Sequence, residues 1–297
     1  MLKGTTADPI IRRLVQWGQA RPDVRAMILT STLTSPLAHV DLFSDYDIIV
    51  VVADIAPYMS DAWLDHFGQV LVLYRDPVRL EFGLPRFARI TQYDDGLKID
   101  FTLWPVGMMA HVIAEAERAG GLDPDLDGGY TVLLDKDGST AALPPPTYKA
   151  YIPVPPTEAA YREVVREFFH EATYAAKYLW RGELMPIKYF IDQAMKQDDL
   201  RIMLEWRMEM GHGWAVKPGA YGKWLERYLP PDIWRELEAT YVGPGIEQNW
   251  EAMFATIALF RRVAREVGAH LGYAYPDAFD ERMMAYLQGV RMLDREA

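Results

Sequence analysis

Two aspartates, Asp45 and Asp47, stand one residue apart immediately before the apolar run 48–53. Because side chains alternate along an extended chain, both carboxylates project to the same side, about 7 Å apart along the backbone. Two like charges so placed repel each other unless a cation lies between them, and Mg²⁺ prefers carboxylates together with substrate phosphates. The pair predicts a metal site for phosphate chemistry. The alternative is a solvated loop before a strand, because Asp-x-Asp triplets are common.

A third carboxylate, Asp100, lies in the middle of the predicted strand 97–104. Alternation places it on one face with Thr102 and Trp104, where a lone carboxylate lowers stability unless it has a partner. If this strand neighbours the one after Asp47, three carboxylates converge, which is enough to hold two metal ions for phosphoryl or nucleotidyl transfer. The alternative is an edge-strand aspartate facing water. We expect Trp104, on the same face, to pack near the substrate.

Helices and strands are predicted to intermix in the region that positions these carboxylates. Asp8 followed by Pro9 predicts a helix that ends near Gly18, and a second short helix is expected at 61–67. Apolar runs predict strands at 24–29, 48–53, 70–74 and 97–104. The mixture indicates an α+β fold class for residues 1–142.

A segment with six prolines, residues 143–157, follows this region and disfavours both helix and central strand. We predict that it is a linker between residues 1–142 and a second domain, 158–297. Long helical periodicity begins at Glu158, with further helices expected at 187–210, 221–228, 233–241 and 246–271. The second domain is therefore predicted to be all-helical.

Composition narrows the possible partners. The chain has 297 residues, 50% of them hydrophobic, and its net charge of −11 repels nucleic-acid backbones but attracts a small cationic substrate. No cysteine is present, which argues against disulfides, zinc–thiolate sites and cysteine nucleophiles and fits the expected cytoplasmic location. No stretch approaches about 20 apolar residues, so we expect no membrane span. The oligomeric state stays open.

The predicted second domain offers further polar groups. On the helix that begins at Glu158, spacings of four and three align one polar stripe, which contains Glu163, Glu167, His170, Tyr174, Lys177 and Arg181. This stripe could face a substrate, or it could be the wet face of an amphipathic helix. Lys223, in a glycine-containing turn, could contact phosphate at a helix N-terminus, although a plain helix start explains the same pattern.

The arrangement of a short strand, a turn at Ser31, Asp45-x-Asp47 and a later strand aspartate resembles the nucleotidyltransferase fold shared with DNA polymerase beta. Longer motifs, across both predicted domains, are similar in order to the aminoglycoside 6-adenylyltransferases that modify streptomycin. They are Asp41-x-Phe43-x-Asp45-Tyr46-Asp47-Ile48, Trp63-Leu64-Asp65-x-Phe67-Gly68, Lys98-Ile99-Asp100-Phe101-Thr102-Leu103, Leu133-Leu134-Asp135-Lys136-Asp137, Trp224-Leu225-x-x-Tyr228-Leu229 and Leu271-x-Tyr273-x-Tyr275-Pro276.

The resemblance implies Mg²⁺-dependent transfer of AMP from ATP to a hydroxyl of a small cationic drug, with release of pyrophosphate. Asp45 and Asp47 would hold the metal ions, and Asp100 would complete the site or accept the hydroxyl proton. Ser31 would contact the phosphates, as would a Tyr-x-x-Lys pair that matches Tyr174 and Lys177. Glu167 would orient the cationic acceptor or deprotonate its hydroxyl.

One turn departs from the family pattern. Where the family has Gly-Ser-Arg, this chain has Thr30-Ser31-Thr32. A β-branched residue resists positive φ, so Thr30 is expected to obstruct the phosphates if the turn needs a glycine conformation, and an arginine charge is lost. Three alternatives therefore stay open: transfer to another small acceptor, a nucleotide- or drug-binding homologue impaired in catalysis, and a metal-dependent hydrolase.

Overall fold

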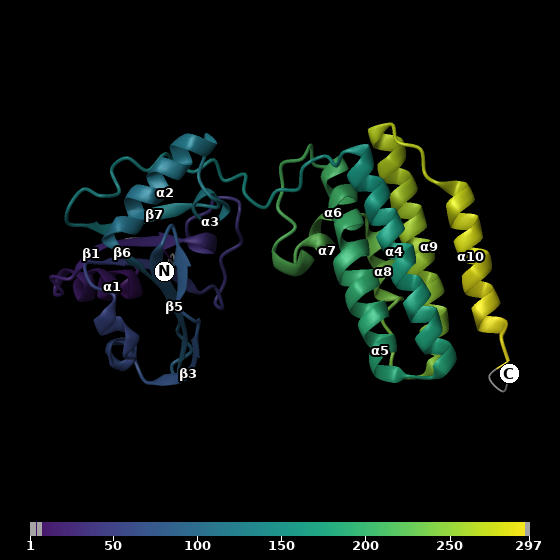
Figure 1. Ribbon diagram of the computed structural model, residues 1–297, viewed down its shortest axis with the longest axis horizontal. Coiled ribbons are helices and arrows are strands. Elements are labelled where there is room, and N and C mark those ends of the chain that lie inside the picture. Colours follow the sequence, from purple (N-terminus) through teal and green to yellow (C-terminus); the bar gives the residue numbers. More distant parts are fainter. Residues whose placement is uncertain (1–3, 5–7, 295–297) are drawn as a thin grey trace. The chain divides into compact units, whose positions relative to one another are not determined.

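The computed structural model describes residue 4 and residues 8–294, and it divides the chain into two compact units, Met1–Tyr151 and Ile152–Ala297 (Figure 1). The division falls inside the proline-rich segment 143–157. Leu143, at the start of that segment, is buried in the core of the first unit, and the Tyr130 hydroxyl donates a hydrogen bond to the carbonyl of Pro144 at 3.0 Å. The first prolines of this segment therefore pack with the first unit.

The first unit is built on a mixed sheet. Its strand order is β3-β5-β6-β2-β1-β7, with β4 paired to β5; β2 and β6 are parallel, and the other pairs are antiparallel. The strands are β1 (Val24–Thr30), β2 (Tyr46–Val52), β3 (Val70–Arg75), β4 (Arg79–Glu81), β5 (Leu84–Tyr93), β6 (Lys98–Pro105) and β7 (Tyr130–Asp135). The helical elements are α1 (Pro9–Gln19), η1 (Ser31–Leu33), η2 (Ala56–Met59), η3 (Ala62–Phe67), α2 (Val106–Ala119) and α3 (Pro124–Asp127).

Both faces of the central strands are covered. In β2, Ile48 and Val50 belong to a core shared with α1 and η3, whereas Ile49 and Val51 belong to a core shared with α2. A continuous apolar run is what a strand buried on both faces requires. Trp104 is buried in the core on the α2 side.

The parallel register of β2 and β6 determines where the aspartates meet. Asp47 pairs with Asp100, and in the neighbouring antiparallel pair Thr30 lies opposite Asp47. Because side chains alternate, Asp47 shares its face with Ile49 and Val51, and this is the face that α2 covers further along the strand. The two carboxylates are thus placed side by side by backbone pairing alone.

The second unit is largely helical. Its elements are α4 (Glu158–Arg181), α5 (Leu184–Lys188), η4 (Tyr189–Leu200), α6 (Arg201–Met210), η5 (Ala220–Gly222), α7 (Leu225–Tyr228), α8 (Pro231–Glu238), α9 (Ile246–Leu271) and α10 (Asp277–Met292). The rings of Phe168 on α4 and Phe260 on α9 stack with centroids 3.7 Å apart at the centre of one hydrophobic core. A mixed sheet with helices followed by a helical unit confirms the α+β prediction.

Several elements differ from the sequence predictions. The segment expected as one helix over 187–210 is α5, a π-helix (η4) and α6 in succession, and the helix expected at 61–67 is 3₁₀. Helical periodicity cannot separate these types, because all three place apolar residues about three to five positions apart. The helix predicted at 221–228 shrinks to a 3₁₀ turn and α7. Among the described residues, no helix is both long and apolar enough to span a bilayer.

We expect Tyr46→Phe to lower the free energy of unfolding by about 1–2 kcal/mol, because the Tyr46 hydroxyl donates a 2.8 Å hydrogen bond to the buried Asp8 carboxylate that caps α1. Urea denaturation measures the change. The matched control is Tyr74→Phe, which removes an exposed hydroxyl and should have little effect. Equal stability of Tyr46→Phe and the unmodified protein would show that the bond contributes nothing net.

Candidate active site

Three carboxylates meet at one end of the paired strands β2 and β6. One oxygen from each of Asp45, Asp47 and Asp100 lies within 4.8 Å of the others. Asp47 and Asp100 are register partners, and Asp45 reaches the same place from the segment that leads into β2. The structure therefore brings together the three aspartates that the sequence predicted.

Burial and mutual repulsion disfavour the negative charge of this group. The pKa of Asp47 is raised to about 7 by burial first and then by the negative charges of Asp45 and Asp100, against a hydrogen bond from Ser31 that lowers it. Burial also raises the pKa of Asp100, although Lys98 opposes the shift. Such a site gains stability when a cation enters it.

A lysine that sequence reasoning missed lies in the same cluster. The Lys98 ammonium donates a 2.8 Å hydrogen bond to Asp100 Oδ2 and a second one to Asp45 Oδ2. Burial lowers the pKa of Lys98, but these two hydrogen bonds outweigh it, and the pKa is raised overall. Because side chains alternate along a strand, Lys98 lies on the same face of β6 as Asp100, two residues later. This alternation is a sequence pattern that could have identified Lys98.

The acidic group fits a divalent cation. Asp100 Oδ1 is buried and accepts no hydrogen bond from any residue in the described part of the chain. Within residue 4 and residues 8–294, these aspartates are the one group of three acidic or histidine side chains with ligand atoms close enough to share an ion. Carboxylate oxygens are the protein ligands that Mg²⁺ prefers. The residues present therefore suit Mg²⁺.

The turn at Ser31 contains one residue in the left-handed conformation, and that residue is not Thr30. Thr30 is extended, with φ −129° and 7% exposure, and its hydroxyl donates a 3.5 Å hydrogen bond to the carbonyl of Asp47. Ser31 adopts the left-handed conformation instead, with φ +68°, and its carbonyl accepts hydrogen bonds from the Thr34 backbone and hydroxyl. Thr30 therefore does not adopt the positive φ that favours glycine, and the left-handed residue of the turn is the next one.

The remaining predicted residues lie in the second unit. Tyr174 and Lys177 are together on α4, with the Lys177 ammonium 4.3 Å from the Tyr174 ring centroid, a cation–π arrangement. Glu167 is exposed one turn before His170 on the same helix. Lys223 is exposed beside Trp224, and the helix that follows it, α7, has only four residues.

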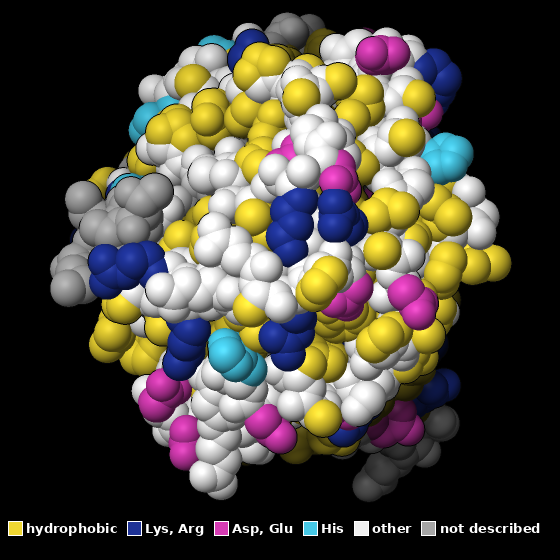
Figure 2. Space-filling view, turned by 90° about the vertical axis from the view of Figure 1, so that its left-hand side faces the viewer, with side chains coloured by type: hydrophobic (Ala, Val, Ile, Leu, Met, Phe, Trp, Pro, Cys, Tyr) yellow, Lys and Arg dark blue, Asp and Glu magenta, His cyan; other side chains and the backbone are white. Residues whose placement is uncertain are grey.

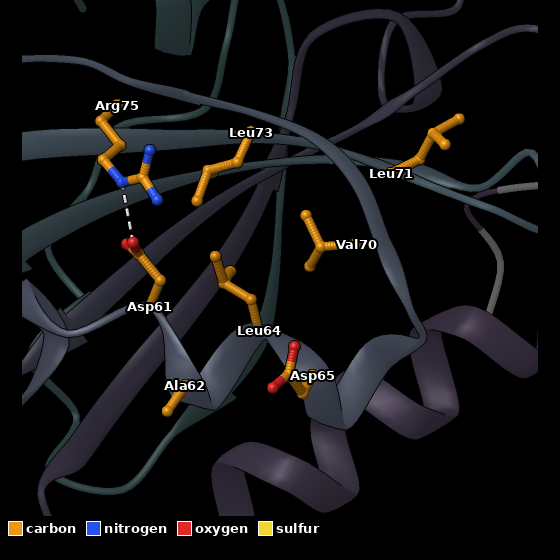
Figure 3. Close-up of a pocket in the computed structure, with 8 residues that line it drawn as sticks. All are labelled: Asp61, Ala62, Leu64, Asp65, Val70, Leu71, Leu73 and Arg75. Carbon is orange, nitrogen blue, oxygen red and sulfur yellow. Dashed lines mark hydrogen bonds and ion pairs between the residues drawn. The ribbon is translucent and has the colours of Figure 1, made fainter.

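A pocket of about 420 Å³ opens elsewhere in the first unit, between η3 and β3, where an ion pair of 2.7 Å joins Arg75 to Asp61 (Figure 3). None of the predicted site residues lines it. Figure 2 shows one face of this unit, on which acidic, basic and hydrophobic side chains are interspersed. The convergence of the three aspartates, rather than a cavity or a charged surface, marks the candidate site.

Known proteins resemble the chain over nearly its whole length. A family model described as streptomycin adenylyltransferase matches residues 5–290. An aminoglycoside 6-adenylyltransferase of Bacillus subtilis (strain 168) is 31% identical over 272 residues, which is 90% of this chain and 91% of the relative. One from Campylobacter jejuni is 29% identical over 267 residues, 89% and 88% of the two chains. A crystal structure of an aminoglycoside 6-adenyltransferase from Bacillus subtilis shares 26% identity, covers 95% of this chain and 97% of its own, and has a TM-score of 0.47.

We expect excess Mg²⁺ to raise the melting temperature of the unmodified protein and Asp47→Asn to abolish this rise.

We also expect the stability of the protein to depend on pH through Asp47. The pKa of this carboxyl group is about 7 in the folded protein and 3.8 ordinarily. Between these two pH values, the folded protein therefore binds more protons at Asp47 than the unfolded chain does. The free energy of unfolding therefore falls as the pH rises from 3.8 to about 7, and Asp47→Asn should remove this decrease. Thermal unfolding at about pH 5 and about pH 8, with and without Mg²⁺, measures both effects.

Asp94→Asn is the control, since it removes an exposed carboxylate in the loop between β5 and β6. It should respond to pH and Mg²⁺ as the unmodified protein does. A full Mg²⁺ effect in Asp47→Asn would show that the ion is not held by Asp47.

Proposed function

This chain belongs to the streptomycin adenylyltransferase family, and we propose that it transfers AMP from ATP to a hydroxyl of an aminoglycoside such as streptomycin in a Mg²⁺-dependent reaction that releases pyrophosphate. As a family member it is a nucleotidyltransferase. The observation that carries the proposal is the convergence of Asp45, Asp47 and Asp100 in a chain whose family match covers both units. We expect the reaction to take place in the cytoplasm, where ATP is available.

The carboxylates of Asp45 and Asp47 would hold Mg²⁺ on the triphosphate. Bound there, Mg²⁺ would neutralise the charge that develops on the phosphate oxygens during transfer. Lys98 keeps Asp45 and Asp100 close together through its two hydrogen bonds. The chain thereby fixes the positions of the ligands before the nucleotide binds, and positioning supplies much of the catalysis in such reactions.

The transfer step moves one group and one proton. The acceptor hydroxyl oxygen bonds to the α-phosphorus of ATP, and the bond from that phosphorus to the bridging oxygen breaks, so pyrophosphate leaves with the electron pair. The hydroxyl proton passes to a carboxylate and then to solvent. We assign this role to Asp100, because burial raises its pKa and its Oδ1 has no hydrogen-bond partner in the described residues. Glu167 is the alternative base.

Each unit contains candidate phosphate-binding residues. Ser31, whose side chain hydrogen-bonds Asp47, and the adjacent Thr30 are the candidates in the first unit. Lys177 with Tyr174, and the exposed Lys223, are the candidates in the second. A lysine ammonium suits phosphate as a compact positive charge. Substitution of each residue, with the Michaelis constant for ATP as the readout, tests these assignments.

The acceptor is expected to be cationic. The net charge of −11 favours a positively charged drug over an anionic or neutral one. The extended conformation of Thr30 weakens the argument for a catalytically impaired homologue, and the replacement of the family arginine by Thr32 still supports that alternative. Transfer to a different small acceptor would use the same carboxylates.

We expect streptomycin incubated with the protein, ATP and Mg²⁺ to gain the mass of one AMP, with pyrophosphate released in parallel. Mass spectrometry and a pyrophosphate assay measure the two products. Asp45→Asn or Asp47→Asn should abolish both products without unfolding the chain, because each change removes charge and little volume. Near-normal turnover in either variant would contradict the metal assignment.

Asp100→Asn and Glu167→Gln distinguish the two candidate bases in the same assay. Loss of the general base should lower kcat by about 100-fold or more. AMP released without any acceptor would indicate a hydrolase. Stabilisation by ATP with no product would indicate a binding protein.

We expect Thr30→Gly to leave the rate of AMP transfer unchanged or lower it. The Thr30 side chain is buried in an extended conformation, so glycine removes packing and adds backbone freedom, at a cost of about 1 kcal/mol in stability. Urea denaturation and the AMP-transfer assay measure the two effects. A rate increase would show that Thr30 does hinder the phosphates.

A further inference from the structure

A row of paired residues crosses the sheet of the first unit and passes through the candidate active site. From β1 to β3 its members are Thr30, Asp47, Asp100, Ile90 and Tyr74, each the register partner of the next. Paired residues of adjacent strands point to the same face of a sheet, and such strands lie about 4.8 Å apart. Tyr74, on the edge strand β3, therefore shares the face of Asp100 at a distance of about 10 Å across two strands.

Three apolar side chains occupy this face on β3 and β5. Tyr74 is 58% exposed, Val72 lies two residues earlier on the same face and is 62% exposed, and Ile90 is partly exposed. None of the three packs in the two hydrophobic cores that the described residues of the first unit form. The core on this face lies further along the strands, at Trp104, where α2 covers them. We call Val72, Tyr74 and Ile90 the apolar shelf.

An exposed apolar surface on an edge strand is costly to keep. Edge strands usually carry charged residues that prevent pairing with other chains, yet Val72 and Tyr74 are uncharged. Contiguous apolar side chains that remain exposed are typical of binding surfaces. The apolar shelf is continuous with the three aspartates through the row of paired residues, which favours a substrate of the same site as its occupant.

The geometry of the transfer step indicates which substrate lies over β5 and β3. In an in-line displacement, the attacking hydroxyl oxygen and the leaving pyrophosphate lie on opposite sides of the α-phosphorus. Ser31, a candidate phosphate contact, follows β1 and hydrogen-bonds Asp47 from that side. Asp100, the assigned base, lies on the other side of Asp47, toward β5. With pyrophosphate toward β1, the acceptor approaches over β6 and extends toward the apolar shelf.

We propose that the apolar shelf binds the aminoglycoside acceptor, with Tyr74 as its main contact. The rings of such an acceptor have apolar C–H faces that pack on aromatic and aliphatic side chains, and its cationic groups are attracted to the face of an aromatic ring. An acceptor with several rings places the reacting ring at Asp100 and a neighbouring ring on the shelf. The inference rests on the proposed function, which supplies the identity of the acceptor and its direction of approach.

Calorimetric titration of the full chain with streptomycin tests the shelf separately from catalysis. The titration contains Mg²⁺ and an ATP analogue with a methylene group between the α- and β-phosphorus, which cannot transfer AMP. Tyr74→Ser should weaken streptomycin binding about 10-fold, because the aromatic ring is lost. Tyr74→Phe keeps the ring and should retain binding within about 2-fold. Tyr74 is exposed, so neither change disturbs a core.

Leu71→Ser is the matched control. Leu71 lies on the same edge strand and is 64% exposed, but it lines the pocket between η3 and β3 together with Arg75 (Figure 3). The change removes a similar exposed apolar side chain outside the shelf. Leu71→Ser should bind streptomycin as the unmodified protein does.

Steady-state kinetics separate a binding role from a structural one. Tyr74→Ser should raise the KM for streptomycin about 10-fold and leave the KM for ATP unchanged, because the ring contacts only the acceptor. The melting temperature of the ligand-free protein should stay the same. A merely structural tyrosine would lower the melting temperature and alter both Michaelis constants together.

Several results would overturn the inference. These are unchanged streptomycin affinity in Tyr74→Ser, equal weakening in Leu71→Ser, and no streptomycin binding by the unmodified protein. A rise in the KM for ATP alone would place the nucleotide on the shelf, and a change only in oligomeric state, measured by size-exclusion chromatography, would make it a contact between copies of the chain.

The same experiments separate this inference from the proposed function. Streptomycin that binds through Tyr74 but gains no AMP would contradict the proposed function and support the apolar shelf. AMP transfer to streptomycin that is unaffected by Tyr74→Ser would support the proposed function and overturn the shelf.

Discussion

The parallel pairing of β2 with β6 is the constraint on which the candidate active site depends. It places Asp47 directly opposite Asp100, while the antiparallel partner β1 places Thr30 on the other side of Asp47. A shift of one residue would turn one of the aspartates to the opposite face, into the core beside α1. The apolar residues of β2, buried on both faces, fix this register, so the hydrophobic core holds the carboxylates together against their repulsion.

The sequence was sufficient to predict the three aspartates because alternation and burial follow directly from residue type. The pattern of polar residues beside apolar runs identified Asp45, Asp47 and Asp100. A continuous apolar run identified the buried strand β2. Which strands are neighbours was not recoverable, because pairing between β2 and β6 joins segments about 50 residues apart and depends on the whole sheet. The ion pair of Lys98 with Asp45 depends on the same pairing, whereas its ion pair with Asp100 lies within β6 and was recognisable from strand alternation.

The errors in local structure have a similar origin. Residue types aligned with a family pattern do not assign φ to a position, so the sequence does not show that Ser31, rather than Thr30, is the left-handed residue of the turn. In the same way, helical periodicity predicted one helix over 187–210 but not its π-helical part, whose i→i+5 hydrogen bonds leave the spacing of apolar residues nearly unchanged.

Buried and partly buried carboxylates of this protein are compensated to different extents. Asp8 and Asp280 accept hydrogen bonds from Tyr46 and Arg261 respectively, so their burial is compensated within the fold. Asp47 instead lies beside Asp45 and Asp100, and burial together with these two negative charges raises its pKa to about 7. The hydrogen bond from Ser31 and the charge of Lys98 offset only part of this effect. A cation bound to the three aspartates would therefore stabilise the folded state of the first unit.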